Sequence, residues 1–219
     1  MYITPNKPYT PNFQALRVAQ ASNTINGTLT KLDVYSLSHK DKHFLRQLCE
    51  RTDMKKLMPG LGNDEYKRWH EMLEIATDKA ENPDRRTFVV AKNGSPCGII
   101  TFKPGKKIFD LDCICTWPVE FGKKVNLAGQ TLFKMMFEEF SKAKANKIKL
   151  DAITDGPYPT EPKYAKLGFR AIGTRDNNKI EMEISSNSVK SALNRLDEKI
   201  EQVDIKDSDT VNLCDELNI

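Results

Sequence analysis

The stretch Tyr164-Ala165-Lys166-Leu167-Gly168-Phe169 places a tyrosine, a lysine and a phenylalanine around a single glycine. Glycine is typical of the position after the last residue of a helix, because it adopts a left-handed backbone conformation without steric cost. We therefore expect a short helix over residues 163–167 that ends at Gly168. The tyrosine carries a phenol that can donate a proton, so the same stretch can supply an acid to a reaction.

A second informative stretch runs from Val119 to Phe140. It begins as a turn that contains glycine and lysine, and it continues as a helix whose apolar residues recur at helical spacing. A turn of this kind can offer backbone N–H groups and positive charge to a phosphate. Taken without the rest of the chain, an ordinary turn into a buried helix explains the pattern equally well. The apolar stripe itself predicts core packing: Leu132, Phe133, Met136, Phe137 and Phe140.

Working outward from these stretches, the spacing of apolar residues predicts the element order β-α-α-β-β-β-α-β-α-β-β. Asn93-Gly94 predicts a hairpin turn, and the segment from Ile108 to Ile153 predicts one parallel crossover through a helix. A mixed, mostly antiparallel sheet flanked by helices follows, which is an α+β fold. The expected strands cover residues 32–37, 87–91, 97–102, 108–117, 147–153, 169–172 and 179–184.

Composition divides the 219 residues into three parts. We expect an irregular N-terminal arm over residues 1–30, with a short helix near Phe13–Ala21, and a folded domain over residues 31–185. Residues 186–219 should form an acidic helix and tail, whose apolar stripe docks on the domain or on a second subunit of a homodimer. Residues 187–219 carry a net charge of −4, so the rest carries +8. A basic body favours an anionic ligand, although a solvated lysine-rich surface explains it as well.

The five cysteines are scattered and odd in number, which predicts a reducing, cytoplasmic environment. The sequence has no apolar leader and no run long enough to span a membrane, so we expect no membrane association. Two pairs could suggest a metal, Cys113 with Cys115 and His39 with His43. Two cysteines two apart on a strand share a face that predicts core, and no further pair has the spacing of a zinc site. We therefore expect no metal.

The element order and the hexapeptide together resemble the GNAT superfamily of N-acetyltransferases, over roughly Lys31–Ser185. Members carry Tyr-x-Lys-x-Gly-Phe at the end of the last short helix, and this chain matches every specified position. The resemblance implies a GNAT-like central twisted sheet, acetyl-CoA as the co-substrate, and transfer of the acetyl group to an amine acceptor. We expect the acceptor to be a small molecule or a peptide. An RNA-linked acceptor ranks last, because the sequence has no cluster of basic and aromatic residues.

The resemblance assigns the acyl donor to two segments. Members bind the pantetheine arm through the backbone of the central strand, here Cys115, Thr116 and Trp117. Their phosphate loop, Arg/Gln-x-x-Gly-x-Gly/Ala, aligns with residues 124–129 but meets Leu127 where glycine is usual. A second alignment, over residues 121–126, keeps Gly122 and loses both later glycines. The residues implied at the pyrophosphate are Lys123, Lys124, Val125, Asn126, Leu127, Ala128, Gly129 and Gln130.

The resemblance also assigns roles in the reaction. Tyr164 is the expected general acid for the departing thiolate, and the alternative is a tyrosine packed at a helix end. The family does not specify a general base, and from its place on the central strand Asp112 is the expected one, with a salt bridge to a lysine as the alternative. Asp155–Pro159 replaces the polar helix start that usually follows this strand, so the family's asparagine contact to the cofactor is in doubt. The low glycine content after Val119 leaves a second hypothesis, a catalytically degenerate GNAT-fold binding or regulatory protein.

Overall fold

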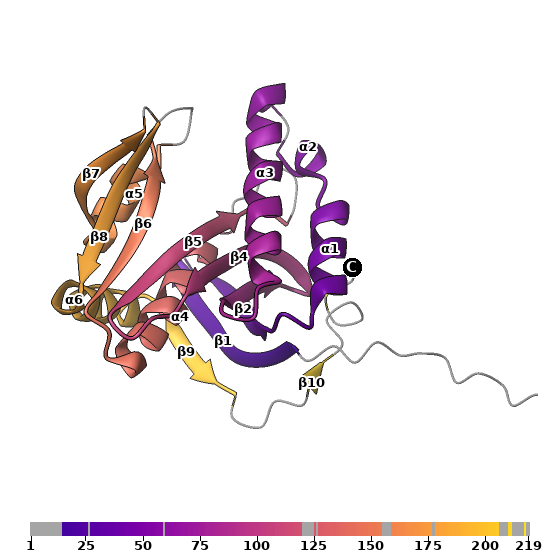
Figure 1. Ribbon diagram of the computed structural model, residues 1–219. Helices are drawn as coiled ribbons and strands as arrows, with labels where there is room; N and C mark the ends of the chain where they lie inside the picture. The colour runs from indigo at the N-terminus through magenta and orange to yellow at the C-terminus, as the bar shows by residue number, and fades with distance from the viewer. Residues whose placement is uncertain are drawn as a thin grey trace, which may run out of the picture.

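The computed structural model describes residues 15–25, 27–58, 60–119, 125, 127–154, 159–176, 178–205, 210–211 and 217. Ten described strands form one sheet in the order β10-β1-β2-β3-β4-β5-β6-β8-β7, and β9 pairs with β1 beside β10 (Figure 1). Among the described strands, only β5 and β6 are parallel neighbours. The strands are β1 (Ala15–Ile25), β2 (Thr28–Leu37), β3 (Arg86–Lys92), β4 (Ser95–Lys103), β5 (Ile108–Thr116), β6 (Lys147–Ile153), β7 (Arg170–Asp176), β8 (Lys179–Ser185), β9 (Glu201–Asp204) and β10 (Thr210–Val211).

The helices cover both faces of the sheet and bury two separate sets of apolar side chains. On one face of the sheet, Phe44 and Leu73 belong to the core. On the opposite face, Phe137 and Leu196 belong to a second core. In Figure 1, β6, β8 and β7 form a wing that stands apart from β2 to β5. The first face carries α1 (Lys42–Arg51), α2 (Met54–Leu57) and α3 (Asn63–Ala80), whereas α4 (Ala128–Ala143), α5 (Glu161–Leu167) and α6 (Ser186–Asp197) belong to the second.

Most predicted elements are confirmed. The hairpin between β3 and β4 turns at Asn93 and Gly94, both with positive φ, as a type I′ turn requires. The apolar stripe of α4 is core: all five of its predicted residues are buried. α5 ends at Gly168 with φ 107°, which confirms the left-handed cap. None of the described helices is both long and apolar enough to cross a lipid bilayer.

The expected irregular arm is wrong for the described part of residues 1–30. Residues 15–25 form a long strand, β1, which pairs with β2 through a turn at Gly27. The sequence predicts a short helix near Phe13–Ala21, and Ala15, Ala19 and Ala21 are indeed good helix formers. In the structure these alanines are buried in the core, so tertiary pairing overrides the local preference.

The acidic C-terminal segment docks on the body. α6 packs on α4, where the buried Lys134 forms ion pairs with Asp197 of α6 and with Glu138 of its own helix. After α6 the chain continues along the free edge of β1 as β9. Residues 186–204 are therefore part of the folded body. The apolar stripe of α6 is covered by other residues of the same chain.

A β-bulge in β5 reverses the direction of its side chains. Thr101 and Phe102 are neighbours in β4, yet they pair with Cys113 and Leu111, so Asp112 is an extra residue. Before the bulge, Phe109 and Leu111 face α4. In a regular strand residues 113 and 115 would face the same side as residues 109 and 111. After the bulge they face α3 instead. The bulge thus lets β5 contribute large apolar side chains to both faces of the sheet.

Gly98 in β4 allows α4 to lie close to the sheet. A Cβ atom at this position would stand 3.0 Å from Leu132 Cδ1, 3.1 Å from Thr116 Cγ2 and 3.1 Å from Val90 Cγ2. Only glycine avoids these contacts without a shift of its neighbours. The close approach brings the first turn of α4 beside the end of β5, where the candidate site begins.

Candidate functional site between strands β5 and β6

The two parallel strands at the centre of the sheet separate after a short paired segment. β5 and β6 pair only over residues 108–110 and 147–149, although β5 continues to Thr116 and β6 to Ile153. The remaining lengths diverge and leave a cleft at their carboxyl ends. In α/β sheets, ligands bind at the carboxyl ends of parallel strands, so this cleft is the first candidate for a binding site.

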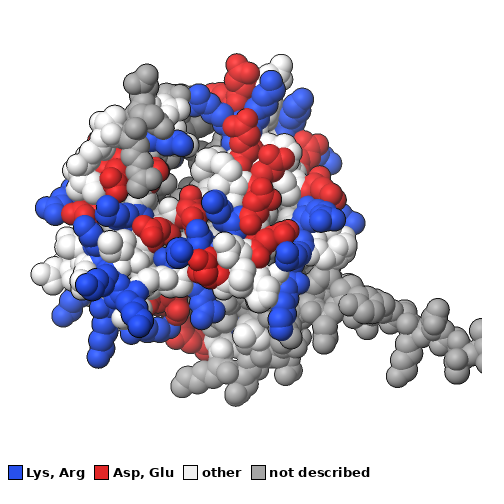
Figure 2. All heavy atoms as spheres, in the orientation of Figure 1, with Lys and Arg blue, Asp and Glu red and all other residues white. Residues whose placement is uncertain are grey.

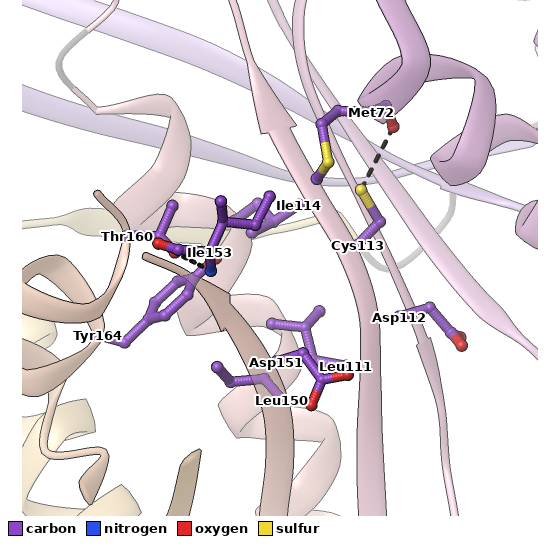
Figure 3. A pocket seen from close by; sticks show the side chains of 10 residues that line it. All are labelled: Met72, Leu111, Asp112, Cys113, Ile114, Leu150, Asp151, Ile153, Thr160 and Tyr164. Atoms are coloured by element: carbon purple, nitrogen blue, oxygen red, sulfur yellow. Dashed lines mark hydrogen bonds between the residues drawn. The ribbon is translucent and has the colours of Figure 1, made fainter. Parts of the chain in front are cut away.

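A small cavity of about 60 Å³ lies in this cleft. α3 closes it on one side and α5 on the other, as Figure 3 shows. Figure 2 shows a hollow in the same region of the surface, beside the acidic side chains of α3. Pockets that hold drug-sized ligands measure roughly 300–1,000 Å³. This cavity is smaller, so it fits a narrow chain end rather than a whole nucleotide. Its lining residues are Met72, Leu111, Asp112, Cys113, Ile114, Leu150, Asp151, Ile153, Thr160 and Tyr164.

Tyr164 projects from α5 into this cleft. Its ring meets those of Phe133 and Phe169 at centroid distances of 5.8 and 6.0 Å, which fixes its orientation. Burial raises the pKa of the Tyr164 phenol well above its ordinary value, and a hydrogen bond with Thr160 opposes this in part. The phenol therefore keeps its proton at neutral pH. It can donate a hydrogen bond or a proton, but it cannot serve as a base there.

Thr160 attaches α5 to the end of β6, a role that the sequence did not suggest. Its hydroxyl oxygen accepts a hydrogen bond from the Ile153 N–H at 2.9 Å and lies 3.2 Å from the Ile153 carbonyl oxygen, to which it donates. The backbone N–H of Thr160 donates to the same carbonyl oxygen at 3.0 Å. Because Tyr164 lies one helical turn later, these bonds set where its side chain enters the cleft. A threonine at the start of a short helix is the only sequence signal for this contact.

The backbone of β5 offers hydrogen-bonding groups to the cleft at alternate residues. The Trp117 N–H donates to the Cys97 carbonyl oxygen of the β4 side at 3.0 Å. By alternation Cys115 also turns its backbone toward β4, whereas Ile114 and Thr116 turn theirs toward the cleft. Of the three predicted pantetheine contacts, only Thr116 has this orientation. The side chains of Cys115 and Trp117 are buried in the core beneath α1 and α3. Ile114, which the sequence did not suggest, shares the orientation of Thr116.

The start of α4 holds the predicted phosphate-binding residues that the structure describes. The side chains of Leu127 and Ala128 are buried in the core, so only their backbone could meet a phosphate, and their assignment to it stays a prediction. Gly129 and Gln130 are half-buried, and the N-cap residue Leu127 makes no side-chain hydrogen bond to the helix. A helix leaves its first N–H groups without intrahelical partners, so the backbone of Gly129 and Gln130 can receive an anion. Val125 is half-buried and its carbonyl oxygen accepts from the Ala128 N–H.

Lys123, Lys124 and Asn126, the other predicted phosphate contacts, lie outside the described residues. Two observations nearby fit a bound ligand. The buried Thr131 hydroxyl, in the first turn of α4, has no hydrogen-bond partner in the described part of the chain. Among the described residues, a Cβ atom at Gly129 would have Thr116 Cγ2, at 3.8 Å, as its nearest neighbour, so these residues leave space between α4 and the end of β5.

Asp112, the predicted general base, is held in an ion pair. Its carboxylate oxygens lie 2.6 Å from Arg85 Nε and 3.4 Å from Arg85 Nη2. Burial raises the pKa of the Asp112 carboxyl, although the hydrogen bond and charge of Arg85 act in the opposite direction. In Figure 3 the carboxylate points away from Tyr164. The salt bridge predicted as the alternative role of Asp112 is therefore present, with an arginine as the partner instead of a lysine. A role of Asp112 as general base stays a prediction.

The two cysteines of β5 are core residues, as the sequence predicted. Both are buried, and the Cys113 thiol donates to the Met72 carbonyl oxygen of α3 at 3.3 Å. Burial raises the pKa of Cys113 to about 12 and that of Cys115 well above its ordinary value. Both thiols therefore stay protonated at neutral pH. This excludes a reactive thiolate at either position.

Comparison with known proteins gives structural matches only. No protein-family model matches the sequence, and no curated protein matches it. Among solved structures, the PaiA N-acetyltransferase from Thermoplasma acidophilum, in complex with coenzyme A, matches with a TM-score of 0.50 and 15% identity over 70% of this chain and 98% of that one. Apo FdhC, a nucleotide-linked sugar GNAT, matches with a TM-score of 0.49 and 16% identity over 80% of this chain and 93% of that one. Spermidine N-acetyltransferase from Vibrio cholerae, with CoA and spermine, matches with a TM-score of 0.46 and 18% identity over 73% and 98%.

Sequence identities this low show a similar fold and do not show a similar activity. The strand order around β5 and β6, the parallel crossover through α4 and the match to PaiA agree with one another. The chain therefore has the GNAT fold, a mixed, mostly antiparallel sheet flanked by helices.

Proposed function

We propose that this protein is an acetyl-CoA-dependent N-acetyltransferase that acts on an amine. The observation that carries the proposal is the cleft between β5 and β6, into which Tyr164 projects. One wall offers the backbone of Ile114 and Thr116 to an extended amide chain. The start of α4, at the end of the same cleft, offers N–H groups to a pyrophosphate. A pantetheine arm carries amides and ends in a thioester, so its chemistry suits this arrangement.

In the proposed reaction the neutral amine attacks the thioester carbonyl carbon. A C–N bond forms, the C–S bond breaks, and the electron pair of that bond stays on sulfur. The Tyr164 phenol gives its proton to the sulfur as the C–S bond breaks. The proton in excess on the product nitrogen leaves to solvent, and solvent returns a proton to the phenolate. The raised pKa means that Tyr164 enters each cycle protonated, but burial also makes the phenol a weaker acid, so the negative charge that develops on sulfur must draw the proton off.

The first test combines binding and turnover. We expect CoA to bind in isothermal titration, and free thiol to appear when acetyl-CoA is mixed with an amine substrate found by screening. Tyr164→Phe should lower kcat by about 10²–10⁴-fold, the usual size of a general-acid effect, and leave CoA affinity nearly unchanged. Tyr66→Phe is the matched control, because that hydroxyl lies on α3 and donates to the Met58 carbonyl oxygen.

Three results would count against the proposal in different ways. No CoA binding at millimolar concentration would reject an acyl-CoA enzyme altogether. An unchanged kcat in Tyr164→Phe would leave the transfer reaction but remove the acid. Binding of CoA without turnover of any amine would favour the second hypothesis, a GNAT-fold binding protein. The burial of Leu127 in place of the usual glycine is the observation that keeps this hypothesis open.

Asp112→Asn tests whether Asp112 is also a base. A base role predicts that the acidic limb of the kcat/KM profile against pH disappears. A purely structural role predicts an unchanged profile and a lower free energy of unfolding, because the Arg85 guanidinium loses its carboxylate partner.

A further inference from the structure

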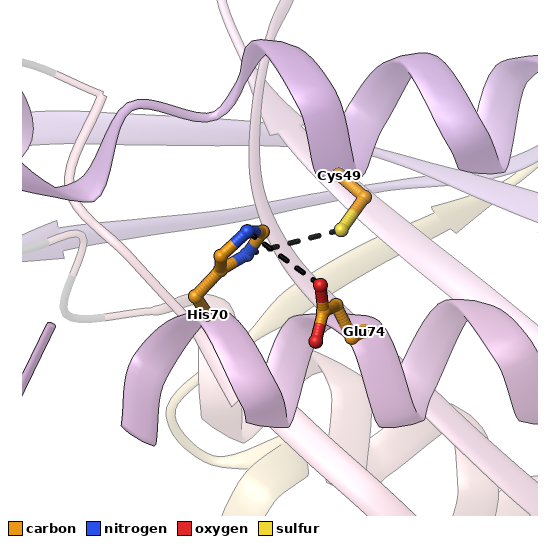
Figure 4. Close-up of side chains that lie close together, drawn as sticks. All are labelled: Cys49, His70 and Glu74. Atoms are coloured by element: carbon orange, nitrogen blue, oxygen red, sulfur yellow. Dashed lines mark hydrogen bonds and ion pairs between the residues drawn. The ribbon is translucent and has the colours of Figure 1, made fainter. Parts of the chain in front are cut away.

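A thiol, an imidazole and a carboxylate meet on the outer surface of the helical layer, away from the cleft between β5 and β6. Cys49 lies near the end of α1, and His70 and Glu74 lie one turn apart on α3 (Figure 4). Cys49 Sγ is 3.9 Å from His70 Nδ1, and His70 Nε2 is 3.6 Å from Glu74 Oε1. One potential ligand atom from each of the three residues lies within 4.8 Å of the other two.

These are three of the ligand types that bind zinc. Bonds of 2.0–2.3 Å in a tetrahedral arrangement place neighbouring ligand atoms about 3.3–3.6 Å apart. The distance of 3.9 Å from Cys49 Sγ to His70 Nδ1 exceeds this range by a few tenths of an ångström, and with one ligand atom taken from each residue all separations are within 4.8 Å. A single ion takes one nitrogen of the imidazole, so the ring or the carboxylate must rotate. Both side chains are 53% exposed and have room to do so.

Two ordinary explanations leave part of the cluster unaccounted for. An exposed histidine–glutamate pair four residues apart stabilises a helix only slightly and does not involve Cys49. A cysteine nucleophile activated by His70 would need a lowered thiol pKa. Instead burial, followed by the charge of Glu74, raises the pKa of the Cys49 thiol. A bound divalent cation would use all three groups and would neutralise the charge that repels the thiolate.

We propose that Cys49, His70 and Glu74 form a binding site for a divalent cation of the zinc type. The fourth position faces solvent and takes a water molecule. Because the ligands come from α1 and α3, the ion joins the two helices. The three ligands come together only in the folded chain. The ion should therefore bind the folded state in preference to the unfolded state and stabilise it. α3 carries Met72 of the cleft, so the ion also braces one wall of the proposed active site.

The test uses the full chain without a polyhistidine tag, first stripped with a chelator and then titrated with Zn²⁺ or Co²⁺. We expect one equivalent to bind, the melting temperature to rise, and Co²⁺ to give a thiolate charge-transfer band. Cys49→Ser should abolish the band. His70→Ala and Glu74→Gln should each weaken Zn²⁺ binding by at least about tenfold. The matched control is the double variant His39→Ala/His43→Ala, which removes the other two histidines of the sequence and should bind as the wild type does.

The proposal is overturned if Zn²⁺ does not bind, if Co²⁺ shows no thiolate band, or if the double variant is the one that loses binding. Circular dichroism of each variant checks that it is folded. If Cys49→Ser does not fold, Glu74→Gln decides, because that side chain is half-exposed and its loss leaves the core intact. None of these outcomes depends on acetyl transfer, so the site and the proposed function can fail separately.

Discussion

Replacing Gly129 by alanine separates a role in folding from a role in binding the acyl donor. A Cβ atom there would meet Thr116 Cγ2 at 3.8 Å, which is an ordinary contact. Alanine is also the better helix former by about 0.8–1.0 kcal/mol in a helix interior. We therefore expect the free energy of unfolding to stay the same or to rise by up to about 1 kcal/mol.

The same methyl group would enter the space where we propose that the pyrophosphate meets α4. Forcing one methyl group into a packed contact costs about 1–3 kcal/mol. Since 1.4 kcal/mol corresponds to a factor of ten, CoA affinity should fall by about 5- to 150-fold. Urea unfolding measures the first quantity, and isothermal titration with CoA measures the second.

Gly98→Ala is the matched control, because its Cβ atom would stand 3.0–3.1 Å from three side chains of the protein itself. It should lower the free energy of unfolding by about 1–3 kcal/mol. The reasoning is refuted if Gly129→Ala binds CoA as tightly as the wild type, or if it destabilises the chain as much as Gly98→Ala does. Either result would make Gly129 an ordinary helix residue.

Two further predictions concern single contacts. Thr160→Val keeps the shape but leaves the Ile153 N–H without its acceptor at 2.9 Å. It should cost about 1–3 kcal/mol in urea unfolding and lower kcat with little change in CoA affinity. Arg170 and then Lys147 lower the pKa of Glu183 from 4.5 to about 2. This contribution to stability is present above pH 4.5 and is lost as the pH falls toward 2. The melting temperature of Glu183→Gln should therefore fall less over that range than that of the wild type; parallel curves would contradict this.

The features that the sequence predicted are those with a local cause. Asn93-Gly94 specifies its hairpin, because both residues tolerate positive φ. Gly168 ends α5 for the same reason. The apolar stripe of α4 follows from a period that one helix face imposes. Together these signals predicted the order of elements along the chain and one parallel crossover, whereas the strand order and the cleft beside Tyr164 come from the structure.

The features that the sequence did not predict depend on residues far apart in the chain. β1 is rich in alanine and gains its strand conformation from pairing with β2 and with β9, more than 170 residues away. Thr160 contributes to the site because β6 ends beside it, at Ile153. Arg85 contributes because its side chain reaches Asp112. Leu127 was assigned to the phosphate loop from its position in a motif, and the structure adds that its apolar side chain is buried in the core.

The extra residue in β5 connects the fold to the site. Pairing with β6 ends at Asp110, two residues before the bulge, and a bulge bends its strand and increases its twist. The same insertion turns Cys113 toward α3, so the strand stays anchored to the helical layer while it leaves β6. Arg85 then holds the bulged residue by its carboxylate. The cleft thus depends on Asp112 through the backbone that it bends, whatever its carboxylate does in the reaction.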